Sequence, residues 1–239
     1  MVSKARTQNR RIMTNTHIEL IIDRSGSMQG IKRDMEGGLN SFIKEQAALP
    51  GKLTVTLNDF DTEFRTVFAN RDGKEVPYIV IDPRGGTALY DAIGRSISKL
   101  ELVSPIATNR VGWMNSNGQL SRFKKVGYEA PVFSEATKNI VVIVTDGEEN
   151  SSREWKREAI KALVSKKREQ GWEFIFLGAN QDAVFVAEGM GIARTSSITY
   201  SPTYAGVTNS TQSLNSYASN VRLGNTAAFS DSDREKALV

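Results

Sequence analysis

Along this chain, short apolar runs alternate with segments in which apolar residues recur every three or four positions. Residues 18–23 form an apolar run that opens into a turn rich in Ser and Gly, which predicts a buried strand ending in a loop. Residues 31–45 have one apolar and one charged face, which predicts an amphipathic helix. By the same criteria, further strands are expected at 53–58, 64–68, 139–145, 172–177 and 196–200, and further helices at 87–100, 155–164 and 182–190.

This order of elements predicts an α/β fold with a doubly wound, mostly parallel sheet and helices on both faces. Only a short turn separates 53–58 from 64–68, which indicates one antiparallel pair. Residues 201–220 fit the pattern less well, because eleven of them are Ser, Thr or Asn. We still expect a helix there, since Val207 and Leu214 fall on one helical face.

The domain boundaries follow from where the periodic pattern stops. Residues 1–15 and 224–239 offer no periodic apolar residues, so we expect a flexible leader and a flexible tail around one domain at 16–223. Residues 104–138 are too many for an ordinary connection, and Asn117-Gly118 is a hairpin signal, so an inserted hairpin is expected there. The preceding helix runs away from the carboxyl edge of the sheet, which places this insertion at the opposite end.

Composition limits the classes of protein to which the chain can belong. With 239 residues and 39% apolar content, one α/β domain is the usual outcome. The chain has no cysteine, which excludes disulfides, thiolate metal sites and a cysteine nucleophile. No apolar run has the length of a signal peptide or the ~20 residues of a membrane span. A soluble cytoplasmic protein, with no membrane partner, is therefore expected.

The formal net charge of +4 is concentrated at the N-terminus, where Lys4, Arg6, Arg10 and Arg11 occur without an acid. The rest of the chain is therefore balanced, and the folded part is not basic overall. An alternative function is nucleic-acid binding through this leader and the insertion, whose five basic residues outnumber Glu129 and Glu135.

Three loops carry oxygen-bearing side chains at strand ends or helix starts, namely 23–27, 85–87 and 145–147. Ligands of a doubly wound sheet collect at the carboxyl ends of its strands, where we expect these loops to meet. Two carboxylates and three hydroxyls, without sulfur or imidazole, suit Mg²⁺, with Mn²⁺ or Ca²⁺ as alternatives, and disfavour zinc. The predicted ligands are Asp23, Ser25, Ser27, Thr87 and Asp146.

The motifs D-x-S-x-S from residue 23, G-G-T-x-L-Y-D-A from residue 85 and V-I-V-T-D-G from residue 142 resemble the von Willebrand factor A (vWA) domain over roughly Thr16 to Tyr200. In that family these motifs form the metal-ion-dependent adhesion site (MIDAS). The resemblance implies a six-stranded sheet with one antiparallel edge strand. It is strongest to stand-alone bacterial and phage-encoded members, on segments 148–152 and 171–180.

Carried over to this chain, the resemblance implies a role for each predicted ligand. Ser25 and Ser27 would coordinate the metal directly, Thr87 directly or through water, and Asp23 and Asp146 largely through water. With only two carboxylates nearby, the ion would accept an anionic oxygen from outside. The implied function is metal-dependent binding of a protein partner that offers an Asp or Glu carboxylate.

Alternative interpretations remain for these residues. The five side chains could serve only as turn and loop residues. A Mg²⁺-dependent phosphohydrolase with Asp23 as nucleophile is disfavoured, because Ser25 stands where haloacid-dehalogenase-type phosphatases carry a second carboxylate. With one histidine, no cysteine and no G-x-S-x-G motif, we expect no enzyme. Structural roles are expected for His17 and Asp91, and solvent exposure for Glu148 and Glu149.

Overall fold

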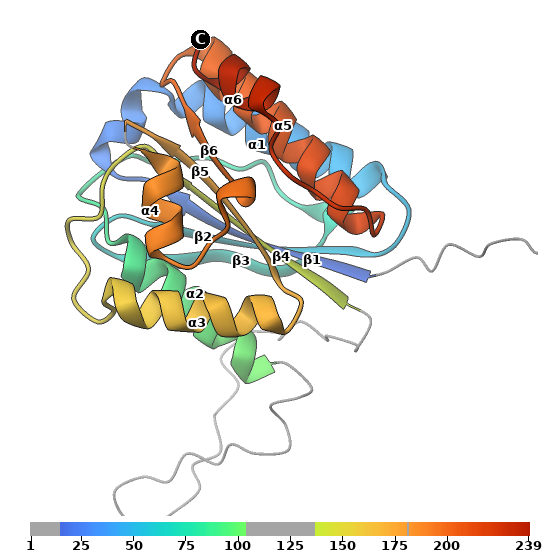
Figure 1. The fold of residues 1–239 in the computed structure, drawn as a ribbon, viewed down its shortest axis with the longest axis horizontal. Helices are drawn as coiled ribbons and strands as arrows, with labels where there is room; N and C mark the ends of the chain where they lie inside the picture. Colours follow the sequence, from blue (N-terminus) through green and yellow to red (C-terminus); the bar gives the residue numbers. More distant parts are fainter. Residues whose placement is uncertain (1–14, 104–136, 181) are drawn as a thin grey trace, which may run out of the picture.

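The computed structural model describes residues 15–103, 137–180 and 182–239, which form a six-stranded sheet between two layers of helices (Figure 1). The strands are β1 (Asn15–Asp23), β2 (Leu53–Phe60), β3 (Phe64–Asp72), β4 (Thr137–Thr145), β5 (Glu173–Ala179) and β6 (Ser197–Tyr200). The α-helices are α1 (Lys32–Ala48), α2 (Leu89–Val103), α3 (Arg157–Glu169), α4 (Ala183–Gly189), α5 (Tyr204–Arg222) and α6 (Asp231–Ala237). Short 3₁₀ turns at Gly26–Gly30 and Gly73–Glu75 precede α1 and follow β3.

The strand order is β3-β2-β1-β4-β5-β6, with β1 and β4 side by side at the centre. Every neighbouring pair is parallel except β2 and β3, which are antiparallel. The mostly parallel sheet with one antiparallel edge strand is therefore confirmed. Its central strands are long apolar runs because helices bury them on both faces.

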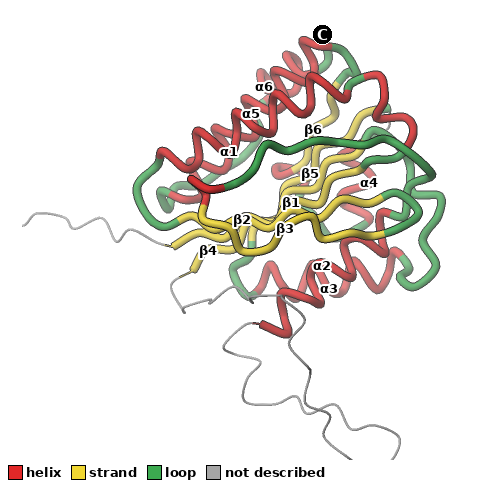
Figure 2. Tube along the Cα trace, turned by 180° about the vertical axis from the view of Figure 1, so that it is seen from behind, coloured by secondary structure: helices red, strands yellow, loops and turns green. Residues whose placement is uncertain are grey.

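Alternation along each strand supplies the two cores. Ile18, Leu20 and Ile22 of β1 belong to the core that α1, α5 and α6 cover. Ile21 points the other way, into the core shared with α2, α3 and α4. Figure 2 shows the two helical layers on opposite sides of the strands.

The polar helix expected at 201–220 is present as α5, and a glycine of α1 lets the two helices pack closely. A Cβ on Gly38 of α1 would lie 2.7 Å from the Thr211 side chain of α5, so the two helices touch where Gly38 lacks one. About two turns further along α1, Gln46 donates hydrogen bonds to Asn215 Oδ1 at 2.7 Å and Ser219 Oγ at 3.0 Å. Polar residues in α5 therefore serve the interface between the helices rather than solvent alone.

The C-terminal segment differs from the flexible tail expected at 224–239, because it contains the ordered helix α6. Ser230 and Asp233 form a reciprocal capping box at its start. Phe229 is buried, with its ring 5.0 Å from that of Tyr217, and Ala237 is fully buried. Burial of Phe229 and Ala237 is enough to hold this segment against the domain, although the two residues show no helical periodicity, because α5 and β6 already provide a surface on which it packs.

The long connection between α2 and β4 is described only at its ends. Residues 104–136, where the hairpin was expected, lie outside the described residues, as does the leader at 1–14, and residues 137 and 138 belong to β4. Thr137 pairs with Asn15 at the start of β1. The attachment point at β4 therefore lies at the amino end of the parallel strands. Within the described part of the chain, no helix is long and apolar enough to cross a bilayer.

Candidate functional site

Two central strands bring the first and third predicted loops together. Ile22 of β1 pairs with Val144 of β4, so Asp23 and Thr145 follow at the same edge of the sheet. From there the chain leaves β1 toward α1 on one face and leaves β4 toward α3 on the other. This divergence opens a crevice at the carboxyl ends of the strands, where such sheets bind ligands.

A continuous set of hydrogen bonds joins four of the five predicted ligands. Asp23 accepts from the Ser25 backbone N–H at Oδ1 and from the Thr145 hydroxyl at Oδ2, both at 2.6 Å. The Ser25 and Ser27 hydroxyls lie 3.0 Å apart, and Ser27 donates to Asp146 Oδ1 at 2.6 Å. The structure thus brings together side chains that are up to 123 positions apart in the sequence.

The fifth predicted ligand, Thr87, reaches this cluster beside Gly147. A Cβ built on Gly147 would lie 3.3 Å from Thr87 Oγ1 and 3.5 Å from Ser27 Oγ. Both hydroxyls therefore border the same small space, which glycine leaves free. Ser27 is exposed whereas Thr87 and Asp23 are buried, so this space is reached from solvent on the Ser27 side.

Backbone hydrogen bonds hold the loop of Thr87 against the loop of Asp23. Gly26 N–H donates to the Gly85 carbonyl at 3.1 Å, and Arg84 N–H donates to the Arg24 carbonyl at 2.7 Å. Gly85 has φ +66°, a left-handed conformation that suits glycine. The two loops therefore form one rigid border of the crevice.

Ion pairs attach the same loops to the end of β2 and to the turn that follows it. Arg24, only 3% exposed, pairs with Asp59 at 3.3 Å and with Asp61 at 3.0 Å. Arg84 pairs with the same Asp61 carboxylate at 2.7 Å. Asp61 thus links both loops through Arg24 and Arg84. The Asp23 and Asp146 carboxylates face the crevice.

In the absence of a cation, burial makes ionisation of the two crevice carboxylates less favourable. The pKa of Asp23 is raised to about 6, mainly by burial and to a smaller extent by the nearby Asp146 charge, against the lowering effect of the hydrogen bonds from Thr145 and Ser25. Burial also raises the pKa of Asp146, against the hydrogen bond from Ser27. A divalent cation between these groups would favour both ionised forms.

The donor chemistry fits a hard metal ion. Among the described residues, no group of three or more carboxylate, imidazole or thiol side chains is arranged to hold a metal ion. A metal in this crevice would therefore depend on the hydroxyls of Ser25, Ser27 and Thr87 in addition to the two carboxylates. An all-oxygen set of this kind suits Mg²⁺, Mn²⁺ or Ca²⁺.

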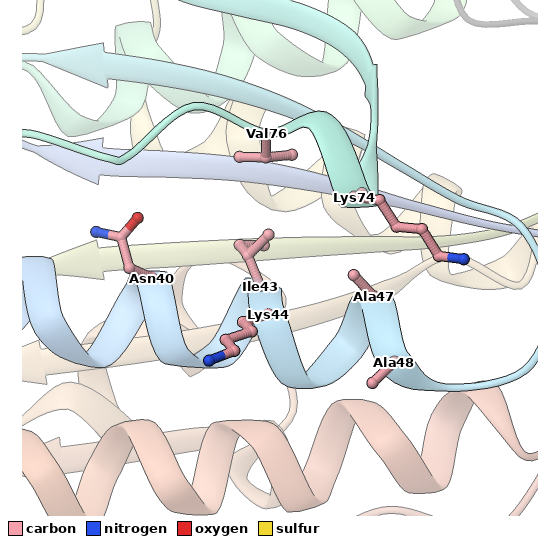
Figure 3. Close-up of a pocket in the computed structure, with 8 residues that line it drawn as sticks. Asn40, Ile43, Lys44, Ala47, Ala48, Lys74 and Val76 are labelled. Carbon is pink, nitrogen blue, oxygen red and sulfur yellow. The ribbon is translucent and has the colours of Figure 1, made fainter.

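A separate groove of about 420 Å³ lies between the second half of α1 and the turn after β3 (Figure 3). Its lining includes Lys44 and Lys74 but no carboxylate. At one end, Asn40 bonds both backbone groups of Ile79, accepting from its N–H at 2.8 Å and donating to its carbonyl at 3.0 Å. This groove has none of the predicted metal ligands.

Comparison with solved structures finds the same architecture in adhesion and matrix proteins. Proximal thread matrix protein 1 from the mussel byssus, in a structure with a zinc-occupied MIDAS motif, aligns over 86% of this chain and 46% of its own, with TM-score 0.58 and 12% identity. The vWF domain of the type V pili tip protein Mfa5 from Porphyromonas gingivalis aligns over 85% and 96%, with TM-score 0.52 and 10% identity. The fold is that of a vWA domain.

The pilus adhesin SpaC from Lactobacillus rhamnosus GG shares the vWA fold over 85% of this chain and 30% of its own, with TM-score 0.55 and 13% identity. This chain thus spans less than half the length of the mussel protein and of SpaC. No family model and no curated protein matches the sequence.

In this vWA fold, the contacts of Asp91 beside the crevice, and of His17 near the amino end of β1, agree with the structural roles expected for them. Asp91 accepts hydrogen bonds from the backbone N–H groups of Arg153, Glu154 and Trp155, and so supports the β4–α3 loop. His17 is buried and bonded to Glu19 and to the Thr54 hydroxyl.

Glu149 was expected in solvent together with Glu148, and for Glu149 this expectation is wrong. Its carboxylate accepts from the Tyr90 N–H at 3.0 Å, in the first turn of α2, and from Ser152 N–H at 2.7 Å. An acidic side chain is favourable there because the first N–H groups of a helix lack partners within it. Glu148 is exposed as expected.

Two further residues, Thr145 and Asn150, complete the local network but were not among the predicted ligands. Thr145 has a signal in the sequence, its position directly before Asp146 at the end of an apolar strand. Asn150 has none, because the backbone that it binds, that of Thr87, lies 63 positions away.

Proposed function

We propose that this vWA-fold chain binds a protein partner through one divalent metal ion, Mg²⁺ in the first place, held by Asp23, Ser25, Ser27, Thr87 and Asp146. The observation that carries the proposal is the convergence of these side chains on one crevice. Ser25, Ser27 and Asp146 are joined by hydrogen bonds, and the Thr87 and Ser27 hydroxyls border the same space beside Gly147. The partner supplies an Asp or Glu carboxylate.

The charge balance supports capture of a carboxylate. Asp23 and Asp146 neutralise a divalent ion only formally, and the three hydroxyls add no charge. A bound Mg²⁺ ion supplies a strong electrostatic attraction for one more anionic oxygen. Ser27 lies on the exposed side of the crevice, which leaves a route for a partner side chain.

Mg²⁺ is proposed from the hardness of the oxygen ligands, with Mn²⁺ and Ca²⁺ as alternatives. The zinc-occupied MIDAS motif of the mussel protein supports divalent binding by this fold and makes Zn²⁺ a necessary competitor in any test. The proposal includes no catalytic step. Asp23 is fully buried and both its carboxylate oxygens accept hydrogen bonds, which disfavours it as a nucleophile for a phosphoryl group.

The alternative of nucleic-acid binding depended on the basic leader and the insertion. Residues 1–14 and 104–136 lie outside the described residues, so the described structure adds no support for it. The protein-binding proposal depends only on residues that the structure describes.

The test is metal-dependent binding measured in two steps. Calorimetric titration of Mg²⁺ into EDTA-treated protein should show one site, and Asp23→Ala, Ser25→Ala and Thr87→Ala should each weaken it by at least about tenfold. Asp82→Ala is the matched control, since Asp82 is an exposed aspartate outside the site. A partner isolated from the native host should then bind in Mg²⁺ and dissociate in EDTA. Equal binding in EDTA and to Asp23→Ala would falsify the proposal.

A further inference from the structure

The peptide groups on both sides of Thr87 are held by another loop rather than by its own. Thr87 N–H donates to Asn150 Oδ1 at 2.9 Å. The Thr87 carbonyl accepts from Asn150 N–H at 3.0 Å and from Ser151 N–H at 3.2 Å. Asn150 therefore bonds both backbone polar groups of a proposed metal ligand without belonging to the ligand set.

The residue before Thr87, Gly86, is also packed tightly against this loop. A Cβ on Gly86 would lie 2.5 Å from Ser151 Oγ and 2.9 Å from Asn150 Oδ1. The loop after β4 thus lies directly against the backbone that leads into Thr87. Any displacement of Asn150 would release the peptide that orients the Thr87 side chain.

Asn150 is itself fixed from two directions. The Ser151 hydroxyl donates to its Oδ1 at 2.6 Å. Before Asn150 in the loop, Glu149 accepts from the Tyr90 N–H of α2. After it, the successive N–H groups of residues 153–155 donate to Asp91 of α2. Trp155 packs directly against α2, because a Cβ on Gly94 would lie 2.3 Å from the Trp155 ring. The loop and the start of α2 therefore form one rigid unit.

A neutral hydroxyl is a weak metal ligand, so its contribution depends on being held in the correct orientation before the metal binds. From these contacts we infer that Asn150 is a positioning residue of the proposed metal site, which raises metal affinity by orienting Thr87. This inference rests on the proposed function. It assigns Asn150 no direct contact with the metal.

A double-mutant cycle on EDTA-treated protein tests the inference, with Mg²⁺ alone as the probe and calorimetry as the readout. Asn150→Ala should weaken Mg²⁺ binding by about tenfold. In a Thr87→Ala background, which keeps the backbone but removes the hydroxyl, Asn150→Ala should have little further effect, because the group that it orients is gone. Asn150→Asp keeps the acceptor for Thr87 N–H and should retain at least the wild-type affinity.

Asn40→Ala is the matched control. The Asn40 side chain accepts from the Ile79 N–H, as the Asn150 side chain accepts from the Thr87 N–H, but it does so at the groove of Figure 3. Its loss should lower the melting temperature without changing Mg²⁺ affinity. Additive effects of Asn150→Ala and Thr87→Ala, or an equal loss of affinity in Asn40→Ala, would overturn the positioning role while leaving the metal site in place. Absence of Mg²⁺ binding by the wild-type protein would remove the proposed site and this inference together.

Discussion

The Thr145 hydroxyl donates a hydrogen bond to Asp23 Oδ2 at 2.6 Å and so joins the carboxyl ends of the two central strands. The same hydroxyl lies 3.0 Å from the Gly147 carbonyl and 3.2 Å from the Gly147 N–H. One buried side chain thus positions the Asp23 carboxylate and the turn that presents Asp146.

Replacing Thr145 by valine keeps the shape of the side chain and removes this hydroxyl. Asp23 Oδ2 then loses its donor inside the protein, and we expect the free energy of unfolding of the metal-free protein to fall by about 1–3 kcal/mol. Urea denaturation in EDTA measures the change. An unchanged midpoint would mean that water replaces the hydroxyl without cost.

Gly86→Ala should damage the metal site by steric pressure. The added methyl would meet Ser151 Oγ and Asn150 Oδ1 at 2.5 and 2.9 Å, so the Thr87 backbone has to move. We expect Mg²⁺ affinity to fall by about tenfold. Gly37→Ala in α1 is the control, because its Cβ meets nothing within 4 Å and should stabilise the helix by about 0.5–1 kcal/mol without affecting Mg²⁺ binding.

The metal-free protein should lose stability as the pH rises from about 4 to 6. The pKa of Asp23 is about 6 in the folded protein, above its ordinary value of 3.8, so the folded state binds more protons than the unfolded state in this window. Ionising Asp23 in the fold should cost up to about 3 kcal/mol. Urea denaturation in EDTA at several pH values, for wild type and Asp23→Asn, isolates this contribution from other acids. Identical pH profiles for the two proteins would contradict it.

Metal binding should stabilise the folded protein by mass action. At a free Mg²⁺ concentration about 100 times the dissociation constant, the gain is about 2.7 kcal/mol, which a thermal melt detects as a rise in Tm. Asp146→Asn removes one of two charges that balance the ion and should abolish most of this rise, whereas the exposed Asp82→Asn should keep it. The same rise in Asp146→Asn would place the ion elsewhere.

The C-terminal helix should contribute to global stability. Phe229→Ala removes a ring that is 5% exposed and packs on Tyr217, and we expect a loss of about 3 kcal/mol. Leu238→Ala, in the same segment but 57% exposed, should change stability by less than about 0.5 kcal/mol. Chemical denaturation of the three proteins compares them. If Phe229→Ala matched wild type, the tail would be dispensable after all.

Local sequence predicted the strands and helices from β1 to α5, and it indicated the proposed ligands. The apolar run before Asp23 predicts a buried strand, and the alternate positions of Asp23, Ser25 and Ser27 follow it directly, so strand end and oxygen donors are visible in one short segment. The same holds for Asp146 after β4. Strand alternation with helices also indicated the mostly parallel sheet, because parallel strands require helical crossovers.

Only the tertiary structure decided which backbone each loop touches and which segments find a surface to bury against. In the sequence, Asn150 is an ordinary loop residue. Its contact with the Thr87 backbone exists only because the fold brings the loop after β4 to the start of α2. The tail reads as polar, yet Phe229 is buried because α5 places Tyr217 beside it. Strand and helix periodicity depend on neighbours within a few residues, whereas these contacts depend on chain segments far apart in sequence that only the assembled sheet and its helical layers bring together.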